Sequence, residues 1–286
     1  AVNNVLKNNQ VSAYFLLTFI ISWGAILSIA GPNGLPAASE EAKQAIGSGL
    51  LLGPSMAAVI LTAVLEGRVG IRELIMPRNS NTNYINLSQI GGSGQYAIAI
   101  LLAPLSSVAT LLMLSTFVNE AYTPKLFIST DKSSLVLSGI SVGLVIATFE
   151  EVGWSGFAVP QLLQTHTVFQ TGVITGFFWG LWHFPLFWEV DTFSSRMSVL
   201  LLFGRLCTWI IAFRVIMVWL YSRMKRSLAF MMMILMHTSL VFCMIAIEPA
   251  LQDSELLKYI FSWTLLLWFA IWFGVRWIYC THEKGQ

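Results

Sequence analysis

The sequence predicts an all-α fold, a polytopic membrane helix bundle of about eight transmembrane helices. Of its 286 residues, 56% are hydrophobic and only 10% are charged, and the mean hydropathy is +0.72. Soluble domains keep about a quarter of their residues charged. The apolar residues also fall in runs of about 20, which is the length that an α-helix needs to cross ~30 Å of hydrocarbon.

Eight stretches are expected to cross the membrane as helices, because backbone groups in lipid must be hydrogen-bonded within their own segment. They are approximately residues 11–30, 46–65, 95–118, 134–158, 170–188, 198–221, 228–247 and 256–279. The first is interpreted as a span and not as a removed signal peptide, since no A-x-A-like cleavage site follows a short apolar region. Residues 66–94, rich in Asn, Ser and Gly, are expected to form a loop with a short surface helix. No repeat or linker divides the chain, so residues 1–286 are predicted to form a single membrane domain.

The distribution of Lys and Arg predicts that both termini are cytoplasmic. Nine of these residues fall in the loops on the N-terminal side of the membrane and five on the other side, and positive charge favours the cytoplasm. A net charge of +2 is too small to suggest a nucleic-acid partner. Three cysteines, Cys207, Cys243 and Cys280, lack C-x-x-C spacing and are expected to be inert thiols.

Four ionisable residues are predicted to lie inside the membrane, where charge is costly and therefore indicates function. Glu150 and Glu151 are adjacent in the fourth span, His183 lies in the fifth and His237 in the seventh. A buried carboxylate can act as a general base, and a histidine can orient a water or donate to an oxyanion. Glu150, His183 and His237 also form an alternative zinc set with an open position. Adjacent helical residues point ~100° apart, so one glutamate is expected to face any given centre.

Two other interpretations of these residues remain open from the residue types alone. The glutamate pair could relay protons or ions in a transporter. It could also belong to a purely structural polar core, in which Arg205 or Arg214 of the sixth span pairs with the carboxylates, although both arginines could instead snorkel to the interface.

Three motifs resemble the CPBP family of intramembrane proteases, also called the ABI family. The string E-E-V-G-W-S-G-F-A-V-P-Q-L at 150–162 resembles the first motif, whose pattern is E-E-x-x-x-R. F-F-W-G-L-W-H-F-P at 177–185 is similar to the second motif, and the run at 218–239 to the approach to the third, H-x-x-x-N. Residues 13–24 resemble the family's first span, and residues 51–74 resemble its second span and the basic loop that follows it. The family includes CAAX prenyl proteases of the glutamate type and bacteriocin-processing or self-immunity proteins.

The resemblance implies a protease core at about 134–247 and a role for each ionisable residue. Glu150 would activate the attacking water with His183, Glu151 would support the site, and His237 would help to stabilise the oxyanion. The implied substrate is a hydrophobic or lipidated peptide, hydrolysed within or at the edge of the lipid bilayer. No cofactor is implied as required, because the motifs lack H-E-x-x-H spacing; zinc is the alternative.

Five further residues are expected to bind substrate or to support the site: Trp154, Ser155, Trp179, Thr238 and Val241. Trp179 holds the aromatic place four residues before the histidine of the second motif. Trp154 lies between Gly153 and Gly156, where the helix could kink.

The sequence departs from the family pattern at two positions. Ser155 replaces the arginine of the first motif and cannot offset a carboxylate's charge. Val241 replaces the asparagine of the third motif, and losing one oxyanion donor typically costs ~10²–10³ in rate. Thr238, Ser239 or a relocated Arg214 could compensate. Three hypotheses follow. The first is an active protease with altered supporting residues. The second is a degenerate relative that binds a peptide or lipid-modified partner without cleaving it, as in bacteriocin self-immunity, and the third is a transporter or other membrane protein.

Overall fold

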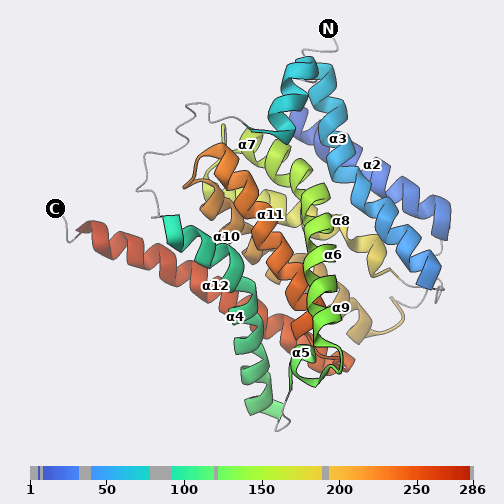
Figure 1. The fold of residues 1–286 in the computed structure, drawn as a ribbon, viewed down its shortest axis with the longest axis vertical. Coiled ribbons are helices and arrows are strands. Elements are labelled where there is room, and N and C mark those ends of the chain that lie inside the picture. Colours follow the sequence, from blue (N-terminus) through green and yellow to red (C-terminus); the bar gives the residue numbers. More distant parts are fainter. Residues whose placement is uncertain are drawn as a thin grey trace.

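The computed structural model describes residues 6, 9–31, 40–77, 92–118, 122–188 and 193–283, and every regular element within these ranges is a helix (Figure 1). The elements are α2 (Gln10–Ala30), α3 (Glu40–Ile75), α4 (Gly92–Val118), α5 (Lys125–Ile128), α6 (Lys132–Gly153), α7 (Val159–Leu162), α8 (Val168–Trp182), α9 (Arg196–Cys207), α10 (Trp209–Tyr221), α11 (Arg226–Phe242) and α12 (Asp253–Glu283). The predicted all-α helix bundle is confirmed.

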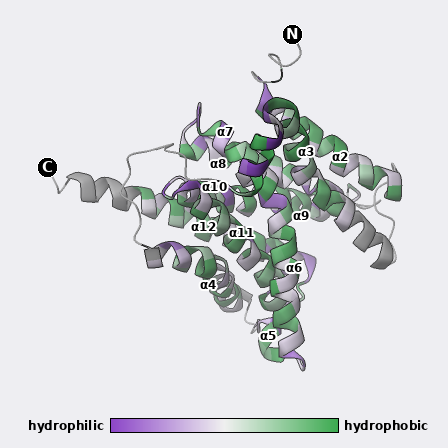
Figure 2. Cartoon of the chain, turned by 45° about the horizontal axis from the view of Figure 1, so that its top comes forward, coloured by the Kyte–Doolittle hydropathy of each residue, from purple (hydrophilic) through white to green (hydrophobic). Residues whose placement is uncertain are grey.

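Seven segments of the described chain are long and apolar enough to cross a membrane. They are Gln10–Ile29, Gly47–Ile75, Ser93–Thr116, Lys132–Leu162, Arg196–Tyr221, Arg226–Ile247 and Asp253–Val275. Figure 2 shows hydrophobic residues along the lengths of these helices. Large apolar side chains also point outward from several of them, among them Leu105, Leu137 and Leu265, each more than 60% exposed. Such an apolar exterior is suited to lipid, and the chain is an integral, multi-pass membrane protein.

The fifth predicted span, residues 170–188, is shorter than expected. It corresponds to α8, whose 15 residues rise about 22 Å at 1.5 Å per residue, less than the ~30 Å of a hydrocarbon core. A capping box fixes its start, since the Thr167 hydroxyl accepts from the Gln170 N–H and the Gln170 side chain accepts from the Thr167 N–H. It ends at Trp182 and is followed by a 3₁₀ turn, Phe184–Leu186, that contains Pro185.

Two other predicted elements differ from the structure in their continuity. The span at 198–221 is interrupted at Thr208 (φ −113°, ψ −88°), which separates α9 from α10. Helix α3 continues to Ile75 beyond a break at Gly67, whose φ of +66° is a conformation that glycine adopts without strain. The segment after that break lies within the expected loop at 66–94, of which residues 78–91 lie outside the described residues.

Glycines on α6 and α8 bring four helices into close contact around the predicted site. A Cβ atom added to Gly176 of α8 would lie 2.9 Å from the Cα of Ile211 and 3.1 Å from the Cβ of Arg214, both on α10. One added to Gly143 of α6 would lie 2.9 Å from the backbone oxygen of Thr238 on α11. Small residues at membrane helix interfaces let backbones approach in this way. Residues from α6, α8, α10 and α11 can therefore meet in the centre of the bundle.

Candidate active site

The two adjacent glutamates lie near the end of α6, immediately before a π-helical turn. Glu150 is 3% exposed and Glu151 is fully buried. The helix widens into the π-turn Trp154–Ala158 directly after Gly153, where α6 packs against the carbonyl group of Pro54 on α3. π-turns of this kind are frequent at functional sites. The turn therefore marks the same point of α6 as its two buried charges.

Glu151 is held by partners from three helical segments. Nη1 of Arg214 donates to both of its carboxylate oxygens, at 3.0 Å to Oε1 and 2.9 Å to Oε2. Nδ1 of His237 lies 2.9 Å from Oε1, and the Ser155 hydroxyl donates to Oε2. Arg214 also donates through Nη2 to the Ser155 hydroxyl at 3.1 Å. The charge of Glu151 is thus matched by a buried cation, and its oxygens are satisfied.

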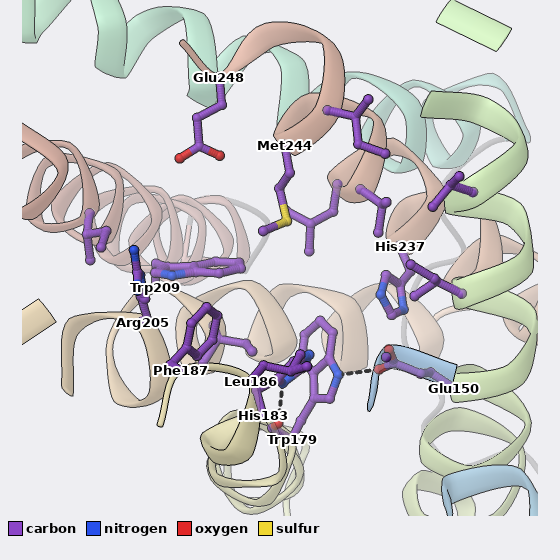
Figure 3. Close-up of a pocket in the computed structure, with 18 of the residues that line it drawn as sticks. Glu150, Trp179, His183, Leu186, Phe187, Arg205, Trp209, His237, Met244 and Glu248 are labelled. Carbon is purple, nitrogen blue, oxygen red and sulfur yellow. Dashed lines mark hydrogen bonds between the residues drawn. The ribbon is translucent and has the colours of Figure 1, made fainter. Parts of the chain in front are cut away.

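Glu150 has a different environment from that of its neighbour. Its Oε2 accepts a hydrogen bond of 2.7 Å from the indole N–H of Trp179 on α8 (Figure 3). Among the described residues, no cation lies within salt-bridge distance of its carboxylate, and the side chain lines a cavity. One carboxylate is therefore neutralised inside the protein, while the other faces open space.

The two histidines are oriented by hydrogen bonds at Nδ1. In His183, Nδ1 lies 2.7 Å from the backbone oxygen of Trp179; because a carbonyl only accepts, Nδ1 carries the proton and Nε2 is free to accept one. In His237, Nδ1 faces Glu151, which leaves Nε2 available to a ligand. The Trp179 ring lies between them, with centroids 5.9 Å from that of His183 and 5.1 Å from that of His237. Trp179 thus connects Glu150 to both imidazoles.

The other predicted site residues divide into those that face the cavity and those that do not. Trp179 and Val241 line it. Trp154 is fully buried in an aromatic cluster, edge-on to Trp182 with centroids 6.0 Å apart. The Thr238 hydroxyl donates to the backbone oxygen of Ile234 at 2.8 Å. Sequence reasoning named Ser155 as a supporting residue, and the structure places it between Glu151 and Arg214.

The Ser239 hydroxyl, another group considered as a replacement donor, also faces away from the cavity. It donates to the backbone oxygen of Ile100 at 2.7 Å. Of the three residues considered as replacements, Thr238, Ser239 and Arg214, it is Arg214 that hydrogen-bonds to a glutamate of the site. It reaches Glu151 from α10, beside Ser155, the position at which the family pattern has its arginine.

The cavity that Glu150 faces has a volume of about 970 Å³. Its walls are mostly apolar, with contributions from Trp209, Ile210, Val241, Met244, Leu256 and Trp263. Cavities of ~300–1,000 Å³ with apolar walls and a few polar groups are typical of ligand sites. The cavity can accommodate an extended apolar ligand beside a carboxylate and two imidazoles.

The alternative zinc set, Glu150, His183 and His237, stays a prediction. Within the described part of the chain, no three His, Cys, Asp or Glu side chains are grouped so that they could hold a metal ion. Nδ1 of each histidine and one oxygen of Glu150 are engaged by protein groups, whereas Nε2 of each histidine is available to a ligand.

Comparison with known proteins places this site within a region of recognisable similarity. Residues 132–243 match the family model described as type II CAAX prenyl endopeptidase Rce1-like. The chain is also 26% identical over 192 residues to a protein named CAAX prenyl protease 2 from Methanococcus maripaludis. That match covers 64% of this chain and 65% of the relative, just under two thirds of the relative's length. Both glutamates and both histidines lie within the region that matches the family model.

Proposed function

Because the chain belongs to the CPBP family of intramembrane proteases, we propose that it is a membrane-embedded endopeptidase in which Glu150 activates a water for peptide-bond hydrolysis. The observation that carries this proposal is the contrast between two neighbouring carboxylates. Glu151 is paired with Arg214 inside the protein, whereas Glu150 faces a cavity and has no paired cation among the described residues. A general base must be ionisable and within reach of a substrate's water, and the position of Glu150 in the wall of the cavity supports this role.

In the proposed reaction, a water between Glu150 and His183 attacks the carbonyl carbon of the scissile bond. Glu150 takes a proton from the water, and the neutral Nε2 of His183 accepts the second hydrogen bond and orients the nucleophile. The proton held by Glu150 then passes to the leaving nitrogen. This arrangement requires no metal, and zinc dependence is the alternative that a chelator tests.

His237 is the proposed oxyanion donor. Its Nδ1 faces the Glu151 carboxylate at 2.9 Å, and in the proposed role its Nε2 carries a proton and donates a hydrogen bond to the developing charge. In this proposal Glu151 positions His237 through its hydrogen bond, and Arg214 and Ser155 hold Glu151 in place, without touching the substrate.

The proposed substrate is a hydrophobic or lipidated peptide that enters from the bilayer. The apolar walls of the cavity support this class, because a polar peptide would lose hydration there without gaining partners. The relative from Methanococcus maripaludis is named a CAAX prenyl protease, and a prenylated peptide is therefore one candidate.

A second candidate function is peptide binding without cleavage. It is favoured by Val241, which lines the cavity and offers no hydrogen-bond donor, and by the Thr238 and Ser239 hydroxyls, which donate to backbone oxygens. Such a protein would hold the same class of peptide but would hydrolyse it slowly or not at all.

The experiment that separates the two functions is peptide cleavage by the purified protein in lipid nanodiscs. Apolar and prenylated C-terminal peptides are incubated with wild type, Glu150→Gln and Val241→Asn, with and without chelator. An endopeptidase cleaves as wild type, loses cleavage in Glu150→Gln and keeps it in chelator. Cleavage by Val241→Asn alone would identify a binding protein on a protease scaffold, and cleavage that survives Glu150→Gln would refute the assigned base.

A further inference from the structure

Trp182, the last residue of α8, is held by α2 at two points. Its indole N–H donates to the Ser22 hydroxyl at 2.8 Å, and its backbone oxygen accepts from the indole N–H of Trp23 at 3.1 Å. Trp182 is 1% exposed, and its ring lies edge-on to that of His183, with centroids 4.8 Å apart. Two consecutive residues of α2 therefore contact the residue directly before His183, the histidine that orients the water in the proposed reaction.

The Ser22 hydroxyl also connects α2 to α3, at the pair Gly53 and Pro54. Proline has no backbone N–H, so Pro54 leaves the carbonyl of Leu50, four residues earlier in α3, without its usual helical donor. Ser22 is fully buried and donates to that carbonyl at 2.7 Å. A Cβ atom added to Gly53 would collide with the Ser22 hydroxyl, so glycine allows this approach. Because the single hydroxyl proton goes to Leu50, the Ser22 oxygen is the acceptor for Trp182.

The contact with Trp23 satisfies a carbonyl group at the end of a helix. The last four carbonyls of an α-helix have no N–H partner within it, and the hydrocarbon region offers no water in its place. The Trp182 carbonyl is one of these, and Trp23 supplies its donor. The His183 N–H, in the same planar peptide group, donates to the Gly180 oxygen at 3.0 Å. Both bonds together fix the peptide that leads into His183.

The contacts with α2 act on a part of α8 that its other bonds leave unfixed. Trp179 joins α8 to Glu150 on α6, but it lies one turn before His183. The Nδ1 bond of His183 runs back to the Trp179 carbonyl and so sets the tautomer and not the position of the helix end. Trp182, held from α2, defines where that end lies.

We propose that Ser22 and Trp23 are positioning residues of the protease, which hold Trp182 so that the His183 imidazole faces the water at Glu150. This inference rests on the proposed function and gives α2 a part in catalysis. Neither Ser22 nor Trp23 lines the cavity that Glu150 faces. Both act through Trp182, without touching the substrate.

The first test does not depend on cleavage. Protein in nanodiscs is labelled with ¹⁵N at histidine, of which the chain has four, and the His183 signals are assigned by their loss in His183→Gln. Wild type should show one His183 species, protonated at Nδ1. Ser22→Ala and Trp23→Phe each remove one hydrogen bond to Trp182 and should add a second species or broaden the first. Ser28→Ala is the matched control, because the Ser28 hydroxyl donates within its own helix, and it should give the wild-type spectrum.

The second test separates kcat from KM for a peptide that wild type cleaves. Ser22→Ala should lower kcat about tenfold and leave KM within about twofold, because a displaced group slows the reaction while the cavity that binds the peptide keeps its shape. Trp182→Phe removes the other partner of the same hydrogen bond. Adding it to Ser22→Ala should therefore cost less than the product of the two separate effects.

The proposal is overturned if folded Ser22→Ala and Trp23→Phe keep the wild-type His183 spectrum and kcat. An effect on KM in place of kcat, an equal effect of Ser28→Ala, or fully multiplicative effects of Ser22→Ala and Trp182→Phe would also overturn it. If Ser22→Ala does not fold, Trp23→Phe decides by the same measurements. If wild type cleaves no peptide, the proposed function fails, and the histidine spectra still decide whether α2 positions His183.

Discussion

The buried pair between Glu151 and Arg214 should contribute strongly to the stability of the bundle. Both side chains are fully buried, with Nη1 2.9 Å from Oε2. The perturbation is Arg214→Met, which keeps an unbranched side chain in the same space and removes the charge. Glu151 then keeps only His237 and Ser155 as hydrogen-bond partners.

The expected loss follows from the depth of the pair. Two unit charges ~4 Å apart interact by about 4 kcal/mol at an effective dielectric constant near 20, and removing one partner of a buried pair typically costs ~3–5 kcal/mol. Arg214→Met should therefore lower the free energy of unfolding by ~3–5 kcal/mol. The double variant Arg214→Met/Glu151→Leu removes both charges and should recover most of this loss, because no buried charge remains unpaired.

The assay is reversible unfolding in mixed micelles, followed by the fluorescence of the buried tryptophans. Arg223→Met is the control: it removes an arginine whose cation–π contact lies outside the site and should cost ~0.5–1 kcal/mol. If Arg214→Met unfolds within ~1 kcal/mol of wild type, or if the double variant is no more stable than the single one, the pair does not carry the stability assigned to it.

Three further variants test the packing and hydrogen bonding around the site. Trp179→Phe keeps a ring but removes the donor that lies 2.7 Å from the Glu150 carboxylate; since such bonds are worth ~1.5–3 kcal/mol, peptide cleavage should fall about 10- to 100-fold, and unchanged cleavage would contradict this role. Gly176→Ala should lower the free energy of unfolding by ~1–3 kcal/mol because it forces α8 from α10, whereas Gly24→Ala, with no atom within 4 Å of the added Cβ, should not; equal effects would refute the close-packing argument. Asp131 accepts the backbone N–H of Ser134 at the start of α6, which lowers its pKa, so its stabilisation is present above its ordinary pKa and is lost as the pH falls through the lowered value. Asp131→Asn should remove this part of the pH dependence of unfolding, and identical pH profiles would count against it.

Much of the fold follows from hydropathy and length, and the differences have local causes. Apolar runs of about 20 residues must form helices in lipid, and the structure has them. Hydropathy, however, does not register where a helix ends inside an apolar run, so the stretch at 170–188 was predicted to continue past Trp182, where α8 ends ahead of Pro185. It also does not detect the break at Thr208, because threonine hydroxyls are common within membrane helices; here the hydroxyl donates to the Gly204 carbonyl at 2.6 Å.

The site was predictable in its residue types but not in its pairings. The cost of burying charge identifies Glu150, Glu151, His183 and His237 from the sequence alone. It does not determine which arginine of the sixth span pairs with a carboxylate, because Arg214 lies 63 residues from Glu151 along the chain. That pairing depends on the close approach of α8 and α10, which only the three-dimensional packing defines.

Ser155 and Arg214 are best understood together. The buried Glu151 carboxylate requires one cation, and α10 supplies it at Arg214, whose Nη2 donates to the Ser155 hydroxyl at 3.1 Å. A second arginine at position 155 would place two cations beside one buried carboxylate, and the uncompensated charge would have to be desolvated at a cost of several kcal/mol. Because Arg214 already supplies the one cation that Glu151 requires, a neutral serine at position 155 keeps the buried charges balanced. The charge that the family's first motif carries on the glutamate helix is supplied here from a neighbouring helix, and Glu150 remains the one carboxylate of the pair that faces the cavity.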